Sequence, residues 1–203
     1  MSQRSKTVFA IALLVIASAG AGVALLLRHG FSAREQPTAL EAFVARHLRR
    51  LAIPHSARRA MNPVPAMSEI LARARAHFAD HCAICHANDG SGSTEIGKSL
   101  YPKAPDMRGS DTQALSDGEL FYIIHNGIRF TGMPAWGARD PAEDRQSWEL
   151  VRFIRHLPRL TEGELAEMRT LNPSSRQKAA EEEEIEKFLL GEDAEPSPPQ
   201  RHH

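Results

Sequence analysis

The sequence is poor in cysteine, in aromatic side chains and in net charge. Two cysteines in 203 residues allow at most one disulfide, which excludes a small scaffold held together by several disulfides. Basic and acidic residues both number 25, and this balance argues against a nucleic-acid-binding protein, which normally carries a basic excess. Aromatic residues make up only 6% of the chain, so a bound apolar cofactor would help to fill its core.

The charges are unevenly distributed along the chain. Residues 1–60 carry nine basic and two acidic side chains, a net of +7, and residues 61–160 carry eleven and twelve, a net of −1. Residues 161–203 carry five and eleven, a net of −6. The length favours one modest domain with accessory segments, and the charge gradient predicts three segments with different roles.

An uncharged run of 20 residues covers positions 8–27. As a helix it would be about 30 Å long, which matches the hydrocarbon thickness of a bilayer. A cleaved signal peptide is the alternative, because Ala17-Ser18-Ala19 resembles a small-residue cleavage site. Cleavage there would leave an apolar new terminus, so the sequence favours an N-terminal transmembrane anchor over residues 1–27.

Residues 28–65 are expected to form a basic amphipathic helix and a proline-containing linker. Apolar side chains recur at helical spacing within 38–53, and arginines lie on or beside the other face. Such a helix can lie on an anionic membrane surface or act as a spacer packed on a partner, and the pattern leaves both readings open. Pro54, Pro63 and Pro65 then prevent a longer helix. The apolar stripe consists of Leu40, Phe43, Val44, His47, Leu48 and Leu51.

Both cysteines fall in one pentapeptide, Cys82-Ala83-Ile84-Cys85-His86. Cys-x-x-Cys-His is the spacing for covalent haem attachment. On one helical turn, Cys82 and Cys85 project to neighbouring positions, and each can form a thioether with a haem vinyl group. His86 is then placed under the iron as an axial nitrogen ligand, so the motif predicts one haem c.

Two other uses of a cysteine pair compete with this interpretation. A structural zinc site would need a second ligand pair at similar spacing, and His77 and His81 precede Cys82 on the same predicted helix without forming one. A thioredoxin-like dithiol would follow a strand, whereas residues 68–85 have helix-forming composition. A membrane-tethered dithiol protein without haem remains the alternative.

A methionine between glycine and proline follows 47 residues beyond His86, in Gly132-Met133-Pro134. A low-spin haem used for electron transfer needs a sixth ligand, and a methionine sulfur opposite histidine raises its potential. Glycine permits close backbone approach, and proline stiffens the loop. A lone methionine is otherwise an ordinary core residue. Between the cysteine motif and Pro134, Met107 is the only methionine besides Met133, so Met133 is the favoured sixth ligand.

Two further helices are predicted after the cysteine motif. The first covers 116–127, where Ser116 and Glu119 form a capping box and Gly127 ends the helix. The second covers 144–157 and carries apolar residues at three- and four-residue spacing before Pro158. No stretch alternates as a strand would, so the expected fold is all-α.

The ordered motifs in residues 66–160 resemble those of the class I c-type cytochromes. Ala74 and Phe78 stand where that family has a small residue, usually glycine, and an aromatic residue on its first helix. Alanine is a departure that would widen the crossing of the first and last helices. The resemblance implies a cytochrome c-like haem domain over 66–160, preceded by the transmembrane helix.

The resemblance also implies roles for residues around the haem. Pro105 corresponds to the proline whose carbonyl accepts a hydrogen bond from the axial histidine, with Pro102 as a weaker candidate. Arg129 and Trp136 flank the Met133 loop and correspond to residues that bind a haem propionate in the family. A solvated arginine and a packed tryptophan are the alternatives for these two.

By the same resemblance, the chain would be a membrane-anchored, monohaem electron carrier and not itself an enzyme. Its partners would be membrane lipid and redox proteins, such as a dehydrogenase, an oxidase or another cytochrome, and not nucleic acid. Haem attachment places such domains on the periplasmic side of the bacterial inner membrane, although the flanking arginine count alone does not decide the orientation. An open sixth position would instead indicate a ligand-binding, sensory or peroxidase-like haem protein.

Residues 161–203 are expected to form an acidic, partly helical tail. Thr161 and Glu164 resemble a capping box, residues 175–190 have helical composition, and prolines follow towards the end. The acidic run is either a solvated face or a docking surface for a basic partner, such as the arginine-rich 46–59 region. His202 and His203 would bind metal only adventitiously.

Overall fold

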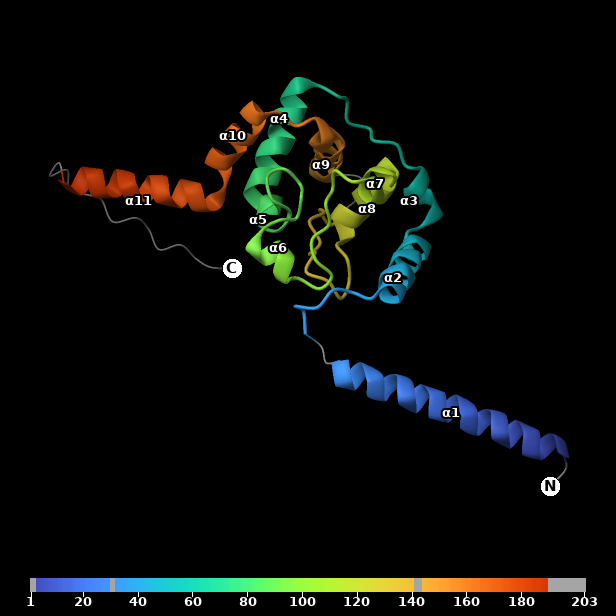
Figure 1. Ribbon diagram of the computed structural model, residues 1–203. Helices are drawn as coiled ribbons and strands as arrows, with labels where there is room; N and C mark the ends of the chain where they lie inside the picture. Colours follow the sequence, from blue (N-terminus) through green and yellow to red (C-terminus); the bar gives the residue numbers. More distant parts are fainter. Residues whose placement is uncertain (1–2, 30–31, 141–143, 190–203) are drawn as a thin grey trace. The chain divides into compact units, whose positions relative to one another are not determined.

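The computed structural model describes residues 3–29, 32–140 and 144–189, and these ranges contain helices, turns and loops without a strand (Figure 1). The predicted all-α fold is confirmed. The chain divides into two units, residues 1–36 and residues 37–203, which are considered separately below.

The first unit consists of one long apolar helix, α1 (Gln3–His29). Residues Gln3–Leu25 have a mean hydropathy of 2.5, and none of this segment is buried against other parts of the protein. A helix of 27 residues is about 40 Å long, sufficient to cross a bilayer. Among the described residues, α1 alone has the length and composition of a membrane-spanning helix.

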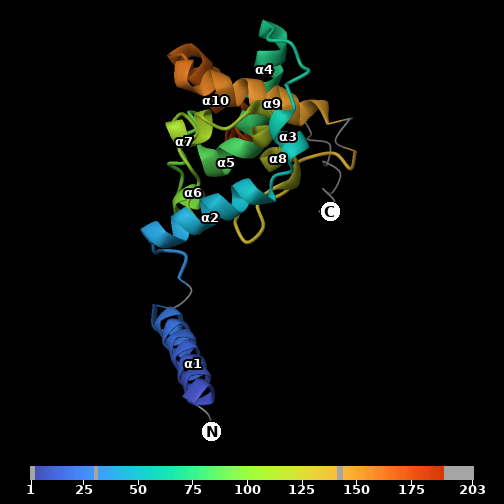
Figure 2. The ribbon, with the colours of Figure 1, turned by 90° about the vertical axis from the view of Figure 1, so that its right-hand side faces the viewer.

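The second unit contains the remaining helices (Figures 1 and 2). Their order is α2 (Ala39–Ala52), α3 (His55–Arg59), α4 (Ser68–His77), a π-helical turn (Phe78–Cys82), α5 (Ala83–His86), α6 (Glu95–Ser99), α7 (Ser110–Gln113), α8 (Asp117–Asn126), α9 (Arg145–His156), a 3-10 turn (Leu157–Arg159), α10 (Glu162–Leu171) and α11 (Pro173–Leu189).

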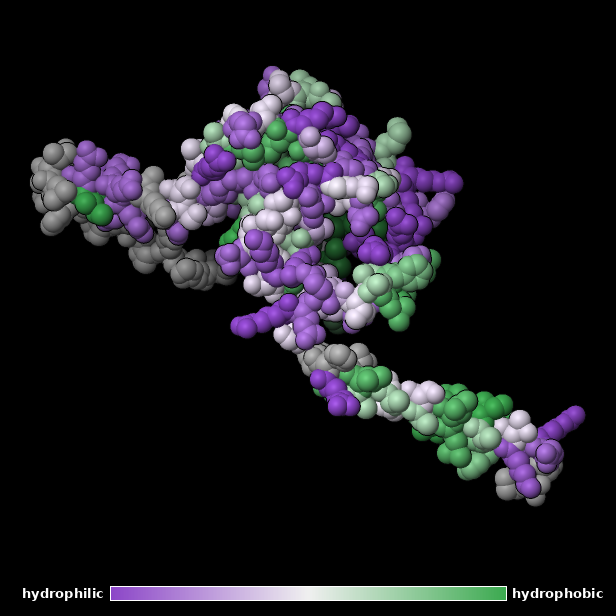
Figure 3. Space-filling view, in the orientation of Figure 1, coloured by the Kyte–Doolittle hydropathy of each residue, from purple (hydrophilic) through white to green (hydrophobic). Residues whose placement is uncertain are grey.

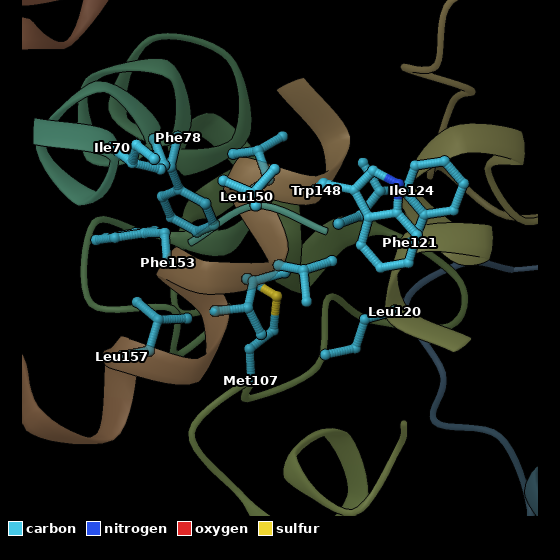
Figure 4. Close-up of a cluster of buried hydrophobic side chains, with 14 of the residues drawn as sticks. Ile70, Phe78, Met107, Leu120, Phe121, Ile124, Trp148, Leu150, Phe153 and Leu157 are labelled. Atoms are coloured by element: carbon cyan, nitrogen blue, oxygen red, sulfur yellow. The ribbon is translucent and has the colours of Figure 1, made fainter. Parts of the chain in front are cut away.

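The core of this unit forms where α4 packs against α9 and α9 packs against α8. The rings of Phe78 and Phe153 lie 5.0 Å apart, and both side chains are almost fully buried. On the other side of α9, Trp148 stacks on Phe121 with ring centroids 4.1 Å apart. Figure 4 shows these two aromatic pairs among the aliphatic side chains that surround α9. Ala74, the expected helix-crossing residue, is buried on α4.

Local capping signals begin the helices at the predicted places. The Ser116 hydroxyl accepts a hydrogen bond from the Glu119 amide at 3.1 Å, and the Glu119 carboxylate accepts one from the Ser116 amide at 2.8 Å. Gly127 ends α8 with a φ of 65°, and Asp144 caps α9. Both predicted helices of the middle segment are therefore confirmed.

The first helix of the predicted haem domain is less regular than its composition indicates. The expected helix over 68–85 is α4 followed by the π-helical turn Phe78–Cys82 and then α5. The Ala83 amide bonds to the Phe78 carbonyl, five residues earlier, which is the π pattern. The wider turn rotates the cysteine motif about the helix axis by about 100° relative to a continuous α-helix.

The acidic C-terminal segment begins as part of the core. Met168 of α10 is fully buried. Glu164 accepts hydrogen bonds from Arg75 of α4 and His156 of α9, each at 2.9 Å. Two helical stretches were expected here and are present as α10 and α11, while residues 190–203, with His202 and His203, lie outside the described residues.

Glu164 provides a test of this docking. Burial alone would raise the pKa of Glu164, but hydrogen bonds from the Thr161 amide, His156 and the Thr161 hydroxyl lower it from 4.5 to about 2. A carboxylate with a lowered folded pKa stabilises the fold above its unfolded pKa, and that stabilisation is lost as the pH falls from about 4.5 towards about 2.

We expect Glu164→Gln to lower the free energy of unfolding by about 1–3 kcal/mol at pH 7, because it removes hydrogen bonds to a charged group. The difference from the unmodified protein should shrink between pH 4.5 and pH 2, as measured by urea unfolding followed by circular dichroism. Glu162→Gln, on the exposed side of α10, is the matched control and should change little. A pH-independent difference would refute the charge-based account.

Candidate haem site

The two cysteines lie three residues apart, within about one turn, directly after α4. Cys82 ends the π-helical turn, Cys85 belongs to α5, and both are free thiols and half-buried. Burial, with a smaller effect of the neighbouring Cys85, raises the pKa of Cys82 to about 12, and burial also raises the pKa of Cys85. A redox dithiol or a thiolate metal site needs the opposite shift, towards the thiolate. Neither cysteine shows the shift of a reactive dithiol.

His86 is neutral in this environment. Burial lowers the pKa of its imidazole, and a neutral imidazole is the form that binds iron. Its Nδ1 atom is buried and has no hydrogen-bond partner. Two thiols and a neutral imidazole within one turn are the donor set that covalent haem requires, so these residues fit haem c.

A glycine-rich loop, residues 87–107, closes over the motif. The Gly92 amide donates to the His86 carbonyl at 2.8 Å, and the Thr94 hydroxyl donates to the Cys85 carbonyl at 3.1 Å. A Cβ atom on Gly97 would lie 2.1 Å from that same Cys85 carbonyl. The close approach of two backbones explains why Gly97 cannot carry a side chain.

Pro105 lies within this loop but makes no hydrogen bond to the His86 ring. The Pro105 carbonyl packs against Gly92, 3.1 Å from the position that a Cβ on this glycine would take. The His86 Nδ1 atom, which would have to donate to that carbonyl, has no hydrogen-bond partner. Pro102 is exposed. The orienting role given to Pro105, or more weakly to Pro102, therefore stays a prediction.

Hydrogen bonds fix the Met133 loop at both ends. The Ile128 amide donates to the Met133 carbonyl at 3.1 Å, and the Met133 amide donates to the Thr131 hydroxyl at 3.1 Å. Further along, the Trp136 amide donates to the Ile124 carbonyl at 3.1 Å. Met133 itself is half-buried. The loop is thus bound to the end of α8 and holds its methionine in a defined backbone position.

A buried ion pair that the sequence did not reveal supports this loop. His125 Nδ1 lies 2.7 Å from an Asp144 carboxylate oxygen, and the two side chains are 10% and 4% exposed. Burial opposes ionisation of Asp144, but hydrogen bonds from Ser147 and His125 lower its pKa. Gly137 packs directly against the His125 ring, because a Cβ there would lie 2.0 Å from Nδ1. The pair ties α8, α9 and the far end of the Met133 loop together.

Arg129 and Trp136 lie at the surface of the same loop. Arg129 is exposed, and the Trp136 ring lies 5.6 Å from the ring of His81, which precedes the cysteine motif. The structure thus brings Trp136 near the start of the motif. Binding of a haem propionate by either residue stays a prediction.

Comparison with known proteins identifies the class of this domain. Residues 69–154 match the family model of cytochrome c oxidase, cbb3-type, subunit III. The cbb3-type cytochrome c oxidase subunit CcoP of Cereibacter sphaeroides is 34% identical over 70 residues, which is 34% of this chain and 22% of that protein. The matched part thus spans about a fifth of the relative.

With one Cys-x-x-Cys-His motif in an all-helical domain, this chain is a monohaem c-type cytochrome that binds haem c covalently. Within that class, its haem domain is similar to subunit III of the cbb3-type oxidases. The apolar helix α1 gives it an N-terminal membrane anchor.

Gly127 offers a test of how tightly the Met133 loop is held. A Cβ atom at this position would lie 2.6 Å from the Pro134 carbonyl carbon and 2.7 Å from the Met133 oxygen, at a φ of 65°. We expect Gly127→Ala to destabilise the domain by about 1–3 kcal/mol, measured by urea unfolding, because the loop must move and the φ is strained.

Gly163→Ala is the matched control, because nothing lies within 4 Å of the added carbon. It should leave stability within about 1 kcal/mol of the unmodified protein, or raise it slightly, since alanine favours a helix over glycine. Equal midpoints for the two variants would contradict a tight fit at Gly127.

Proposed function

We propose that this chain is a membrane-anchored carrier of single electrons whose haem c is held by Cys82, Cys85 and His86 and ligated by His86 and Met133. The observation that carries the proposal is the single Cys-x-x-Cys-His motif, in which His86 and both thiols are half-buried and lie within four residues of one another. Bound haem c supplies one-electron iron chemistry. The chain fixes the ligands, excludes water with an apolar core and supplies the surface on which partners dock.

The hydrogen bonds of the Met133 loop support its part in this proposal. A thioether sulfur is a weak ligand, so it binds best when the backbone that carries it is already in place. Gly127 and the His125–Asp144 pair hold both ends of the loop. If His86 and Met133 both bound the iron, no open position would remain for a substrate, and the chain would transfer electrons without being the enzyme itself.

The redox partners are proposed to be membrane-bound proteins. The similar protein from Cereibacter sphaeroides is named as a subunit of a cytochrome c oxidase. An oxidase complex is therefore the leading partner class, with a dehydrogenase or a second cytochrome on the other side of the electron path. An α1 anchor would keep the haem domain close to the membrane in which such complexes lie.

We propose further that the haem domain lies in the periplasm, with α1 crossing the bacterial inner membrane once. The support is chemical, because thioether attachment of haem to this motif takes place on that side. A protease added to right-side-out spheroplasts should then degrade the haem domain. Inverted membrane vesicles should protect it, and the opposite pattern would refute this orientation.

Replacement of Met133 tests the ligand assignment. Met133→Ala should open the sixth position, so that the reduced protein binds about one carbon monoxide per haem, and the reduction potential should fall. The measurements are visible spectra of oxidised and reduced holoprotein, with and without carbon monoxide, including the ferric sulfur-to-iron band.

Met107→Leu is the matched control, because Met107 is a buried core residue and leucine conserves its volume. It should retain the ferric sulfur band and bind no carbon monoxide. If the unmodified protein already binds carbon monoxide and lacks the band, the open-site, ligand-binding function replaces the carrier function.

A further inference from the structure

Helix α2 turns its apolar stripe away from its own domain. The residues of α2 and its C-cap that are buried or half-buried are Ala42, Arg49 and Ile53, which share one face because they are 7 and 4 residues apart. The large apolar side chains lie on the other face and are 44–77% exposed. These are Leu40, Phe43, Val44, Leu48 and Leu51, and Figure 3 shows them as a green patch at the edge of the second unit.

This orientation is opposite to that of an ordinary surface helix, which buries its apolar stripe and exposes its charges. The packed face of α2 instead carries Arg49, whose pKa is lowered by burial and by Arg50 and Arg46, and raised by Glu119 and Asp111. Arg49 thus faces acidic residues of its own domain. The apolar face has no partner within the second unit's described residues that would bury it.

The following helix fixes α2 to the domain in this orientation. The Ser116 hydroxyl donates to the Arg58 carbonyl at 2.8 Å, so α3 is bound to the start of α8. A Cβ on Gly118 would lie 1.8 Å from the Ala57 carbonyl, which shows how closely the two helices approach. Only Ile53 and Pro54 separate α2 from α3, and Ile53 is 2% exposed. The stripe therefore points outward as a fixed feature of the domain.

We propose that α2 lies in the headgroup region of the membrane, with its apolar stripe in the upper acyl chains and the exposed Arg46 and Arg50 on anionic lipid phosphates. The short linker supports the membrane as the surface that covers the stripe. Nine residues separate His29 of α1 from Ala39 of α2, and they can span about 30 Å. The bilayer that holds α1 is thus always within reach of the stripe.

The charged residues of α2 are also compatible with an anionic membrane surface. Arg46 and Arg50 are exposed and lie between the packed face and the stripe, with Arg50 next to Phe43, so that their long side chains can extend to lipid phosphates. No acidic residue follows Glu41 within α2. An apolar face bordered on one side by arginines, with Glu41 on its other side, is compatible with an interfacial helix. This inference requires the membrane anchor but not the Met133 ligand, so the two proposals can fail separately.

Site-specific labelling of the full-length holoprotein tests the proposal. The sequence has only two cysteines, and in the holoprotein both would be bonded to haem, so an introduced cysteine would be the sole reactive thiol. A bimane fluorophore is placed by Val44→Cys in the stripe, or by Ala45→Cys beside it as the matched control. Each protein is reconstituted into vesicles of phosphatidylcholine and phosphatidylglycerol that contain a lipid-borne spin-label quencher.

We expect the label at position 44 to be quenched by the lipid spin label at least about twofold more than the label at position 45, since only the former enters the acyl region. Equal quenching at the two positions would overturn the proposal. Protection of position 44 from an aqueous quencher without lipid quenching would also overturn it, because a second copy or another protein would then cover the stripe.

A stripe variant separates α2 from the anchor. Phe43→Gln with Leu48→Gln, in the Val44→Cys background, should reduce lipid quenching to the level of the control, while α1 keeps the protein in the membrane. The haem spectrum should not change, which shows that the domain is folded. Undiminished quenching would mean that the anchor alone, and not the stripe, brings position 44 to the lipid.

Discussion

The packing of α4 against α9 is the contact on which the rest of the haem domain depends. Phe78 and Phe153 meet at this interface, and α4 leads without interruption through the π-helical turn into the cysteine motif. The positions of Cys82, Cys85 and His86 are therefore set by a hydrophobic contact one turn earlier. The same helix α9 holds Trp148 against Phe121, so α8 and the loop that follows it are positioned from the same core. A domain with few aromatic residues places four of them at these two contacts.

Features that depend on neighbouring residues could be predicted from the sequence. The apolar run of α1, the Ser116–Glu119 and Thr161–Glu164 capping boxes and the spacing of the cysteine motif all lie within a few residues or a single periodic pattern. Such patterns specify local structure because the groups that satisfy one another are close in the chain. The prediction of a c-type haem domain likewise came from a local pattern, the Cys-x-x-Cys-His motif.

Features formed by distant residues could not be predicted. His125 and Asp144 are 19 residues apart, and Glu164 bonds to Arg75, 89 residues earlier, so neither pair leaves a pattern in the sequence. The assignment of residues 161–203 to a separate tail missed the burial of Met168 for the same reason. With α2, periodicity gave the stripe correctly, but periodicity cannot say whether the stripe faces the domain or the outside.

The protonation of the two thiols has a consequence for the order of biogenesis. In the folded chain, burial holds the pKa of Cys82 at about 12, so almost none of its sulfur is the nucleophilic thiolate at neutral pH. The loop that bonds to the Cys85 and His86 carbonyls closes over the motif from one side. Sulfur–carbon bonds to the vinyl groups are therefore made fastest on a chain that has not yet closed this loop. Ligation first, and closure of this loop over the motif afterwards, is the order that this geometry favours.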